Sequence, residues 1–243
     1  MEQFLTSEFW VAVGQIIMID ILLGGDNAVV IALACRKLPP ALRTKGIIWG
    51  TAGAIVLRVI LIFFALTLLA IPFLKIVGAL LLVWIGIKLI APDDEGGHDV
   101  RASDKLLAAI KTIIVADLVM SVDNVIAIAG AAEGAGGDHK MPLVVFGLLV
   151  SIPIIVWGSQ LVIKLMDRFP SIILIGGMLL GWIAGTMAVS DPALINPEIV
   201  KQIPKLVESP TLRYGASVAG ALLVLVLGKW IAVRRRREAD APA

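Results

Sequence analysis

The chain has 243 residues, of which 59% are hydrophobic and 16% are charged, and its formal net charge at pH 7 is +2. A soluble domain is nearer half apolar and a quarter charged, so this composition indicates a polytopic membrane protein and argues against a soluble one. The single cysteine, Cys35, excludes an intrachain disulfide, and the N-terminal segment lacks the basic start expected of a cleavable signal peptide.

The predicted elements are seven apolar segments of roughly 18–25 residues, the length that crosses ~30 Å of hydrocarbon. In lipid the backbone must satisfy its own hydrogen bonds, so segments of this length and composition are expected to be helices. In chain order they run approximately over 9–35, 46–70, 73–91, 106–132, 142–165, 171–189 and 213–233. The predicted fold class is therefore an all-α polytopic membrane protein with seven transmembrane helices.

A short polar pattern occurs twice inside this apolar sequence, in the first and the fourth segment. Each copy has two acids six residues apart, with an asparagine directly after the second acid. The copies are Asp20, Asp26 and Asn27, and Asp117, Asp123 and Asn124. A carboxylate at membrane depth costs about 3 kcal/mol even on lenient insertion scales. Four such acids in two equivalent places favour a cation site.

The two halves of the chain form a predicted repeat. A shift of 97 residues superposes the first segment on the fourth and Gly50 on Gly147, and a shift of 98 aligns Trp84 with Trp182 in the third and sixth segments. Each repeat unit has three spans, so the second unit must enter the membrane upside down relative to the first. This 3+3 inverted topology is typical of secondary transporters, whose sites lie near the midplane.

The repeat gives a predicted domain organisation, in which the seventh span has no partner and is a structural addition. The predicted parts are a first three-helix repeat over 1–91, a cytoplasmic linker over 92–105, a second inverted repeat over 106–190, an extracytoplasmic loop over 191–212, and a seventh helix with a basic cytoplasmic tail over 213–243. Gly177, Gly181 and Gly185 form a ridge of small residues, which predicts close helix packing.

The distribution of Lys and Arg predicts the orientation. Fifteen of the twenty-one basic residues fall on one side of the seven spans, five fall on the other, and Arg58 lies within a span. The richer side is expected to be cytoplasmic. The N-terminus is then outside and the C-terminus is in the cytoplasm.

The spacing within each motif limits how its groups can meet. Seven residues make nearly two helical turns, so Asp20 and Asn27 share a face, while the second acid points about a third of a turn away. All three groups converge if the helix is broken, and a local unwinding is favoured at Gly24–Gly25 because glycine weakens helices. Alternatively, one acid binds the ion while the other faces a neighbouring helix or a gate.

Four carboxylates and two amide oxygens suit hard divalent cations such as Mn²⁺, Mg²⁺ and Ca²⁺. Zinc and copper prefer His or Cys, but His98 and His139 lie in predicted loops and Cys35 is alone. Because the acids titrate, exchange of protons for metal is chemically available. Arg58 is interpreted as a counter-charge that holds the ion-free site, the alternative being a structural bond to backbone carbonyls. A purely structural alternative has the acids pair with Arg58 or cap broken helices.

The stretches Asp20 to Ala28 and Asp117 to Ala127 resemble the paired signatures of the TerC family of bacterial integral membrane proteins. The resemblance covers about residues 8–190 and is closer to the short, YjbE-like branch. It implies a bacterial inner-membrane manganese exporter, and it places the metal at the six acids and amides of the two motifs. The sequence carries no large nucleotide-binding region that would support ATP coupling.

The predicted function is therefore export of a divalent metal, with Mn²⁺ favoured, by a protein that is not an enzyme. The expected partners are the metal ion and the lipid bilayer; no nucleic acid and no cofactor beyond the metal substrate are expected, and homo-oligomerisation is left open. Two alternatives remain: a carrier of Ca²⁺ or Mg²⁺, and a membrane factor that supports metallation or assembly of secreted proteins. An intramembrane enzyme with paired acids is disfavoured, because such enzymes lack the adjacent asparagine.

Overall fold

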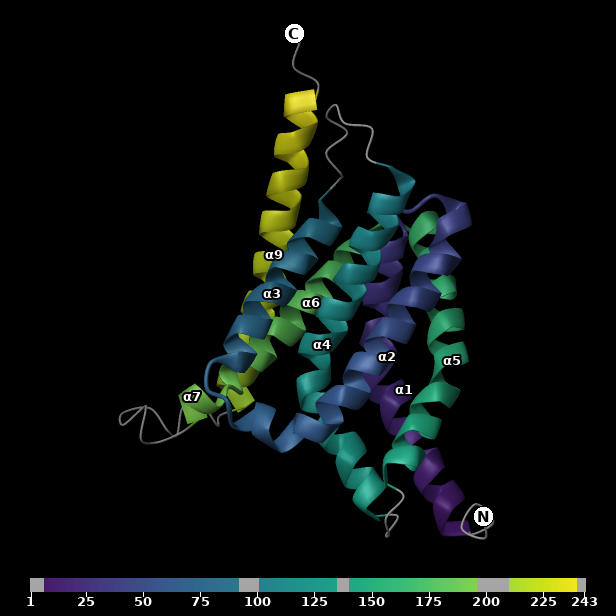
Figure 1. The fold of residues 1–243 in the computed structure, drawn as a ribbon. Coiled ribbons are helices and arrows are strands. Elements are labelled where there is room, and N and C mark those ends of the chain that lie inside the picture. The colour runs from purple at the N-terminus through teal and green to yellow at the C-terminus, as the bar shows by residue number, and fades with distance from the viewer. Residues whose placement is uncertain (1–6, 92–100, 135–139, 196–209, 240–243) are drawn as a thin grey trace. The chain divides into compact units, whose positions relative to one another are not determined.

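The computed structural model describes residues 7–91, 101–134, 140–195 and 210–239, whose regular structure is entirely helical (Figure 1). The helices are α1 (Ser7–Cys35), α2 (Pro40–Ala70), α3 (Leu74–Ile90), α4 (Ala102–Gly134), α5 (Lys140–Arg168), α6 (Ser171–Val189), α7 (Pro192–Ile195) and α9 (Pro210–Ala239). The predicted all-helical class is confirmed over this part of the chain.

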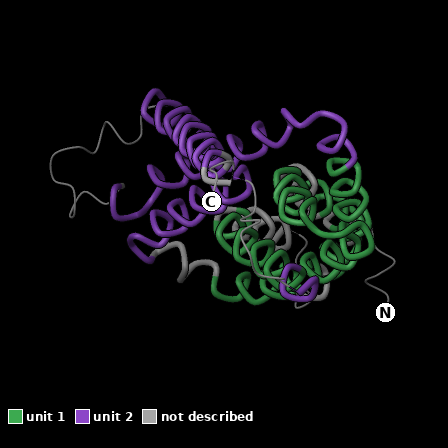
Figure 2. Tube along the Cα trace, turned by 90° about the horizontal axis from the view of Figure 1, so that it is seen from above, with its two compact units in different colours: residues 1–69, 106–163 green, residues 70–105, 164–243 purple. Residues whose placement is uncertain are grey.

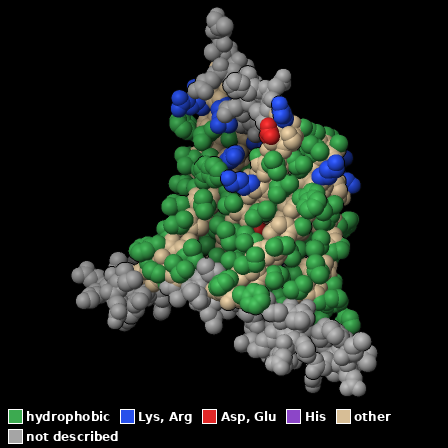
Figure 3. All heavy atoms as spheres, viewed as in Figure 1, with side chains coloured by type: hydrophobic (Ala, Val, Ile, Leu, Met, Phe, Trp, Pro, Cys, Tyr) green, Lys and Arg blue, Asp and Glu red, His purple; other side chains and the backbone are tan. Residues whose placement is uncertain are grey.

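Four stretches of the described residues are long and apolar enough to cross a membrane. They are Pro40–Phe64, Val144–Arg168, Ser171–Val189 and Pro210–Arg235, and Gly25–Cys35 is a shorter apolar helix. Large hydrophobic side chains are exposed on many helices, among them Phe63 and Trp157, and the face drawn in Figure 3 is mostly hydrophobic. Such a surface fits contact with lipid rather than water. The count of seven spans and the inverted repeat stay predictions.

The chain divides into two compact units, residues 1–69 with 106–163 (unit 1) and residues 70–105 with 164–243 (unit 2) (Figure 2). Unit 1 contains α1, α2 and most of α4 and α5, and unit 2 contains α3, α6, α7 and α9. The units therefore do not coincide with the predicted repeats. Each predicted repeat contributes its first two helices to unit 1 and its third helix to unit 2.

In unit 1, glycines on α2 let α4 approach closely. A Cβ atom at Gly50 would lie 2.5 Å from Cδ1 of Ile113, and one at Gly53 would lie 2.6 Å from Cδ1 of Ile114. Ile113 is 1% exposed, so the crossing of these two helices lies in the interior of the unit. This packing brings the polar residues of α2 and α4 within reach of each other.

In unit 2, small residues bring α6 and α9 into backbone contact. A Cβ atom at Gly181 would lie 2.3 Å from the carbonyl oxygen of Gly220, and one at Gly185 would lie 2.1 Å from that of Ala216. Backbone atoms cannot swing away as a side chain can, so these positions require glycine. The close packing predicted from the Gly177, Gly181 and Gly185 ridge is confirmed, and it is the usual way in which helices associate in membranes.

The start of α3 is held by a buried aspartate that sequence reasoning missed. The Asp191 carboxylate accepts hydrogen bonds from the backbone N–H of Phe73 (2.8 Å), of Ile76 (3.1 Å) and of Ala193 (2.7 Å). It therefore caps α3 from a distant part of the chain and also caps the short α7. Phe73 has a φ of 66°, a left-handed conformation that the capped turn sustains.

Candidate cation site

Arg58, Asp117 and Ser121 form a buried polar cluster in unit 1. Arg58 comes from α2, and the other two residues lie one turn apart on α4. Arg58 Nη2 contacts Asp117 Oδ1 at 2.5 Å, Arg58 Nε donates to Ser121 Oγ at 3.0 Å, and Ser121 Oγ donates to Asp117 Oδ2 at 3.0 Å. Each carboxylate oxygen thus has a partner, which offsets part of the cost of burying the charges.

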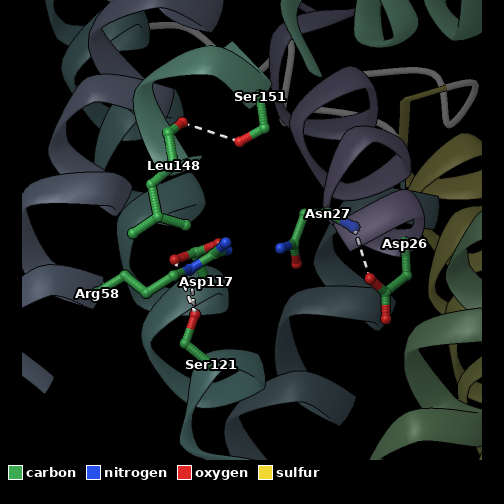
Figure 4. A network of polar contacts seen from close by, with 7 residues as sticks. All are labelled: Asp26, Asn27, Arg58, Asp117, Ser121, Leu148 and Ser151. Atoms are coloured by element: carbon green, nitrogen blue, oxygen red, sulfur yellow. Dashed lines mark hydrogen bonds and ion pairs between the residues drawn. The ribbon is translucent and has the colours of Figure 1, made fainter. Parts of the chain in front are cut away.

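Within the described part of the chain, the buried amide of Asn27 on α1 has no hydrogen-bond partner. The residue is 3% exposed, and neither Oδ1 nor Nδ2 has a partner among the described residues. Figure 4 shows this amide facing the Arg58–Asp117 pair. A buried amide left unsatisfied costs about 1–3 kcal/mol, so it is expected to meet a ligand or an ordered water.

Asp26 points in a different direction from Asn27. Its Oδ1 accepts a hydrogen bond from the backbone N–H of Asn27 at 2.9 Å. In Figure 4 the Asp26 carboxylate lies on the far side of Asn27 from the Arg58–Asp117 pair. The divergence of these neighbours follows from the 100° that separates successive residues on a helix.

The predicted unwinding at Gly24–Gly25 is wrong, because α1 is a continuous helix from Ser7 to Cys35. Helix α4 is likewise continuous through Ser121. Two glycines weaken a helix by only about 1 kcal/mol each. In an apolar segment, each backbone group freed by unwinding costs several kcal/mol, which outweighs that effect.

A second unsatisfied polar group lies on α2. Thr51 is 2% exposed, and its hydroxyl has no partner among the described residues. It lies two turns before Arg58, on the same face of the helix. By contrast, the hydroxyl of Thr112 donates to the backbone carbonyl of Ala108 on its own helix. A lone threonine in an apolar segment gave no signal in the sequence.

One side of the cluster is formed by α5. Leu148 is fully buried, and Ser151 donates its hydroxyl to the Leu148 carbonyl at 2.8 Å. Figure 4 shows the Leu148 side chain pointing toward the Arg58–Asp117 pair, with Ser151 farther from it. The cluster therefore has apolar surroundings on the side of α5. Interactions between charges are stronger in such surroundings than in water.

The structure brings together part of the predicted ligand set. Asn27 and Asp117 are buried, Asp26 adjoins Asn27, and Asn124 on α4 is partly exposed. The side chains of Asp20 and Asp123 lie outside the described ones. Among the described residues, no three His, Cys, Asp or Glu side chains are grouped closely enough to hold a metal. The six-ligand site therefore stays a prediction.

The model of the integral membrane protein TerC family matches residues 5–237 of the chain. An uncharacterized membrane protein of Bacillus subtilis, YjbE, is 43% identical over 187 residues, which cover 77% of this chain and 83% of that protein. YceF of the same organism is 27% identical over 74% of this chain and 71% of its own length, and the Escherichia coli inner membrane protein YgdQ is 27% identical over 67% and 73%. No solved structure matches the chain. The resemblance found in the two motifs is confirmed, and the chain belongs to the TerC family of integral membrane proteins.

Proposed function

We propose that this protein exports a divalent metal cation, with Mn²⁺ favoured, across the bacterial inner membrane. The membrane location rests on its TerC membership, on its long apolar helices and on a relative named as an inner membrane protein. Export, rather than uptake, is proposed from the resemblance of the two motifs.

The observation that carries the proposal is the unsatisfied amide of Asn27 beside the Arg58–Asp117 pair. A buried carbonyl oxygen without a donor, next to a buried carboxylate, forms part of the coordination shell that a hard cation requires. The same unit combines the equivalent helices of both predicted repeats. Inverted-repeat transporters place their substrate sites between such helices.

The proposed ligands are Asn27 and Asp117 together with Asp20, Asp123 and Asn124. Asp26 belongs to the same motif but lies on the far side of Asn27, so we propose it as the acid that faces a neighbouring helix or a gate. Arg58 is the proposed counter-charge of the metal-free state. All these ligands offer oxygen, which suits Mn²⁺, Mg²⁺ and Ca²⁺ better than zinc or copper. Arg58 is paired with Asp117, as a counter-charge would be. No chemical step on the substrate is involved in this proposal.

Protons are the proposed counter-transported ion, because each acid of the two motifs can bind either a proton or the metal cation. The metal would enter from the side rich in Lys and Arg, which we propose to be cytoplasmic. The N-terminus would then lie outside and the basic tail inside.

The test is Mn²⁺ flux into proteoliposomes that contain the purified full-length protein. We expect saturable Mn²⁺ flux that becomes faster when the interior of the vesicles is acidic. Competition by Ca²⁺ or Mg²⁺ then ranks the affinities of the protein for the three cations. If an imposed pH gradient does not change the Mn²⁺ flux, proton coupling is refuted, but the proposed transport of Mn²⁺ is not. If the protein moves no divalent cation but co-purifies with secreted metalloenzymes, an assembly factor is the better description.

A further inference from the structure

We propose that Arg58 is an intramolecular competitor of the transported cation and that Ser121 positions it on Asp117. This inference rests on the proposed function, because it requires a cation to bind at Asp117. It adds a regulation of that same site: the affinity for the cation is set by how firmly Arg58 is held.

The contacts of Asp117 carry the first step. One carboxylate oxygen is taken by Arg58 Nη2 and the other by the Ser121 hydroxyl, which itself accepts from Arg58 Nε. The three side chains thus close a ring of hydrogen bonds. A metal cation that coordinates Asp117 must therefore share these oxygens with the ring or displace part of it.

The electrostatics of the cluster carry the second step. Arg58 is 2% exposed and Asp117 is 6% exposed, so water screens their charges weakly. A guanidinium and a divalent cation cannot share one buried carboxylate without strong repulsion. The guanidinium must therefore leave Asp117 as the metal arrives, and it returns when the metal departs.

The contrast between Asn27 and Asp117 supports this exchange. Among the described residues, neither polar atom of the Asn27 amide has a hydrogen-bond partner, whereas each oxygen of Asp117 accepts one hydrogen bond. The neutral amide oxygen of Asn27 is thus unpartnered among the described residues, while the charge of Asp117 is already balanced by an internal cation. This is the pattern expected when an internal cation occupies the place of the substrate cation at the carboxylate.

The behaviour of Ser121 points to a positioning role. The other buried serines of the described residues donate to carbonyls of their own helices; they are Ser151, Ser159 and Ser217. Ser217 also bonds a side chain of another helix, but that partner is the uncharged hydroxyl of Thr186. Ser121 instead bonds two charged side chains, one of them from a different helix. Arginine suits this arrangement because its planar group presents two donors along one edge.

The experiment compares equilibrium Mn²⁺ binding to the purified full-length protein with that of three variants. Ser121→Ala should bind Mn²⁺ about tenfold more tightly than the wild type, since a hydrogen bond to a charged group no longer holds the competitor. Without metal it should unfold at a lower temperature, and Mn²⁺ should raise that temperature by more than in the wild type. Arg58→Lys replaces the planar, two-nitrogen edge by a single ammonium, which should hold Asp117 less firmly, so this variant should also bind Mn²⁺ more tightly.

Ser159→Ala is the matched control, because it removes a buried serine hydroxyl that donates only to the carbonyl of Ile155. It should bind Mn²⁺ as the wild type does. If Ser121→Ala binds no more tightly than Ser159→Ala, the competitor role is overturned while the proposed function stands. Weaker binding by Arg58→Lys than by the wild type also overturns it. If no protein binds a divalent cation, this inference and the proposed function both fail.

Discussion

Unit 1 and unit 2 each bury an aspartate, and the two residues are satisfied in different ways. Asp191 in unit 2 is held by three backbone N–H groups, two at the start of α3 and one in α7. Asp117 in unit 1 is held by two side chains, near an amide with no partner. Backbone donors cannot leave without unfolding, whereas side-chain donors can. The contrast supports a structural role for Asp191 and the proposed ligand role for Asp117.

The largest effect is expected from Asp117→Asn, which removes the charge that balances a bound cation. We expect Mn²⁺ flux in proteoliposomes to fall roughly a hundredfold, because cation affinity depends steeply on ligand charge. Asp191→Asn is the contrasting change. It should lower the free energy of unfolding by about 1–3 kcal/mol through lost cap hydrogen bonds. If both variants lose the same Mn²⁺ flux per folded molecule, the proposed difference in role between Asp117 and Asp191 is wrong.

The next effect is expected in unit 2, where Gly181→Ala forces a Cβ atom against the backbone of Gly220. We expect a loss of about 1–3 kcal/mol of stability, because the core cannot relax around a backbone clash. Gly215→Ala on α9 is the control, since nothing lies within 4 Å of a Cβ atom there. Thermal unfolding in detergent measures both changes. A neutral Gly181→Ala would mean that α6 and α9 are less tightly packed than described.

A smaller effect on stability, of the opposite sign, is expected in unit 1. Asn27→Leu removes an unsatisfied buried amide, so it should raise the free energy of unfolding by about 1 kcal/mol. The same change should abolish Mn²⁺ flux, because it also removes a proposed ligand. If Asn27→Leu lowers the free energy of unfolding as well as the Mn²⁺ flux, Asn27 is a structural residue.

The smallest effect is expected from Thr51→Val, which removes a buried hydroxyl without a partner and nearly preserves the volume of the side chain. We expect an increase of less than about 1 kcal/mol in unfolding free energy. Thr112→Val, whose hydroxyl bonds the carbonyl of Ala108, should not be stabilised. The difference between the two midpoints, measured by thermal unfolding, tests whether the Thr51 hydroxyl is truly unsatisfied.

Helix-packing faces and family membership could be predicted from the sequence, whereas the contact partners of individual buried side chains could not. The small-residue ridge and the two acidic motifs are local patterns, so their consequences for packing and for family membership could be inferred directly. Which acid pairs with Arg58 could not be inferred, because several acids lie at similar depth and the choice depends on how α2 crosses α4. Asp191 was missed for the same reason: its partners at Phe73 and Ile76 are over a hundred residues away.

The error at Gly24–Gly25 has a different origin. The weak helix propensity of two glycines favours unwinding, but the cost of exposing backbone groups to an apolar environment is larger. With the helix continuous, Asp26 and Asn27 diverge, and the group that faces Asp117 is the amide. The position of Asp26 thus supports the alternative in which one acid of the first motif faces a neighbouring helix or a gate instead of the bound ion.

The most direct test of the central claim is equilibrium Mn²⁺ binding to the purified wild type, Asp117→Asn and Asp191→Asn proteins, each confirmed to be folded. The account predicts that the wild type and Asp191→Asn bind with the same affinity and that Asp117→Asn does not bind in the same range. Equal binding by all three proteins would contradict the assignment of the cation to Asp117.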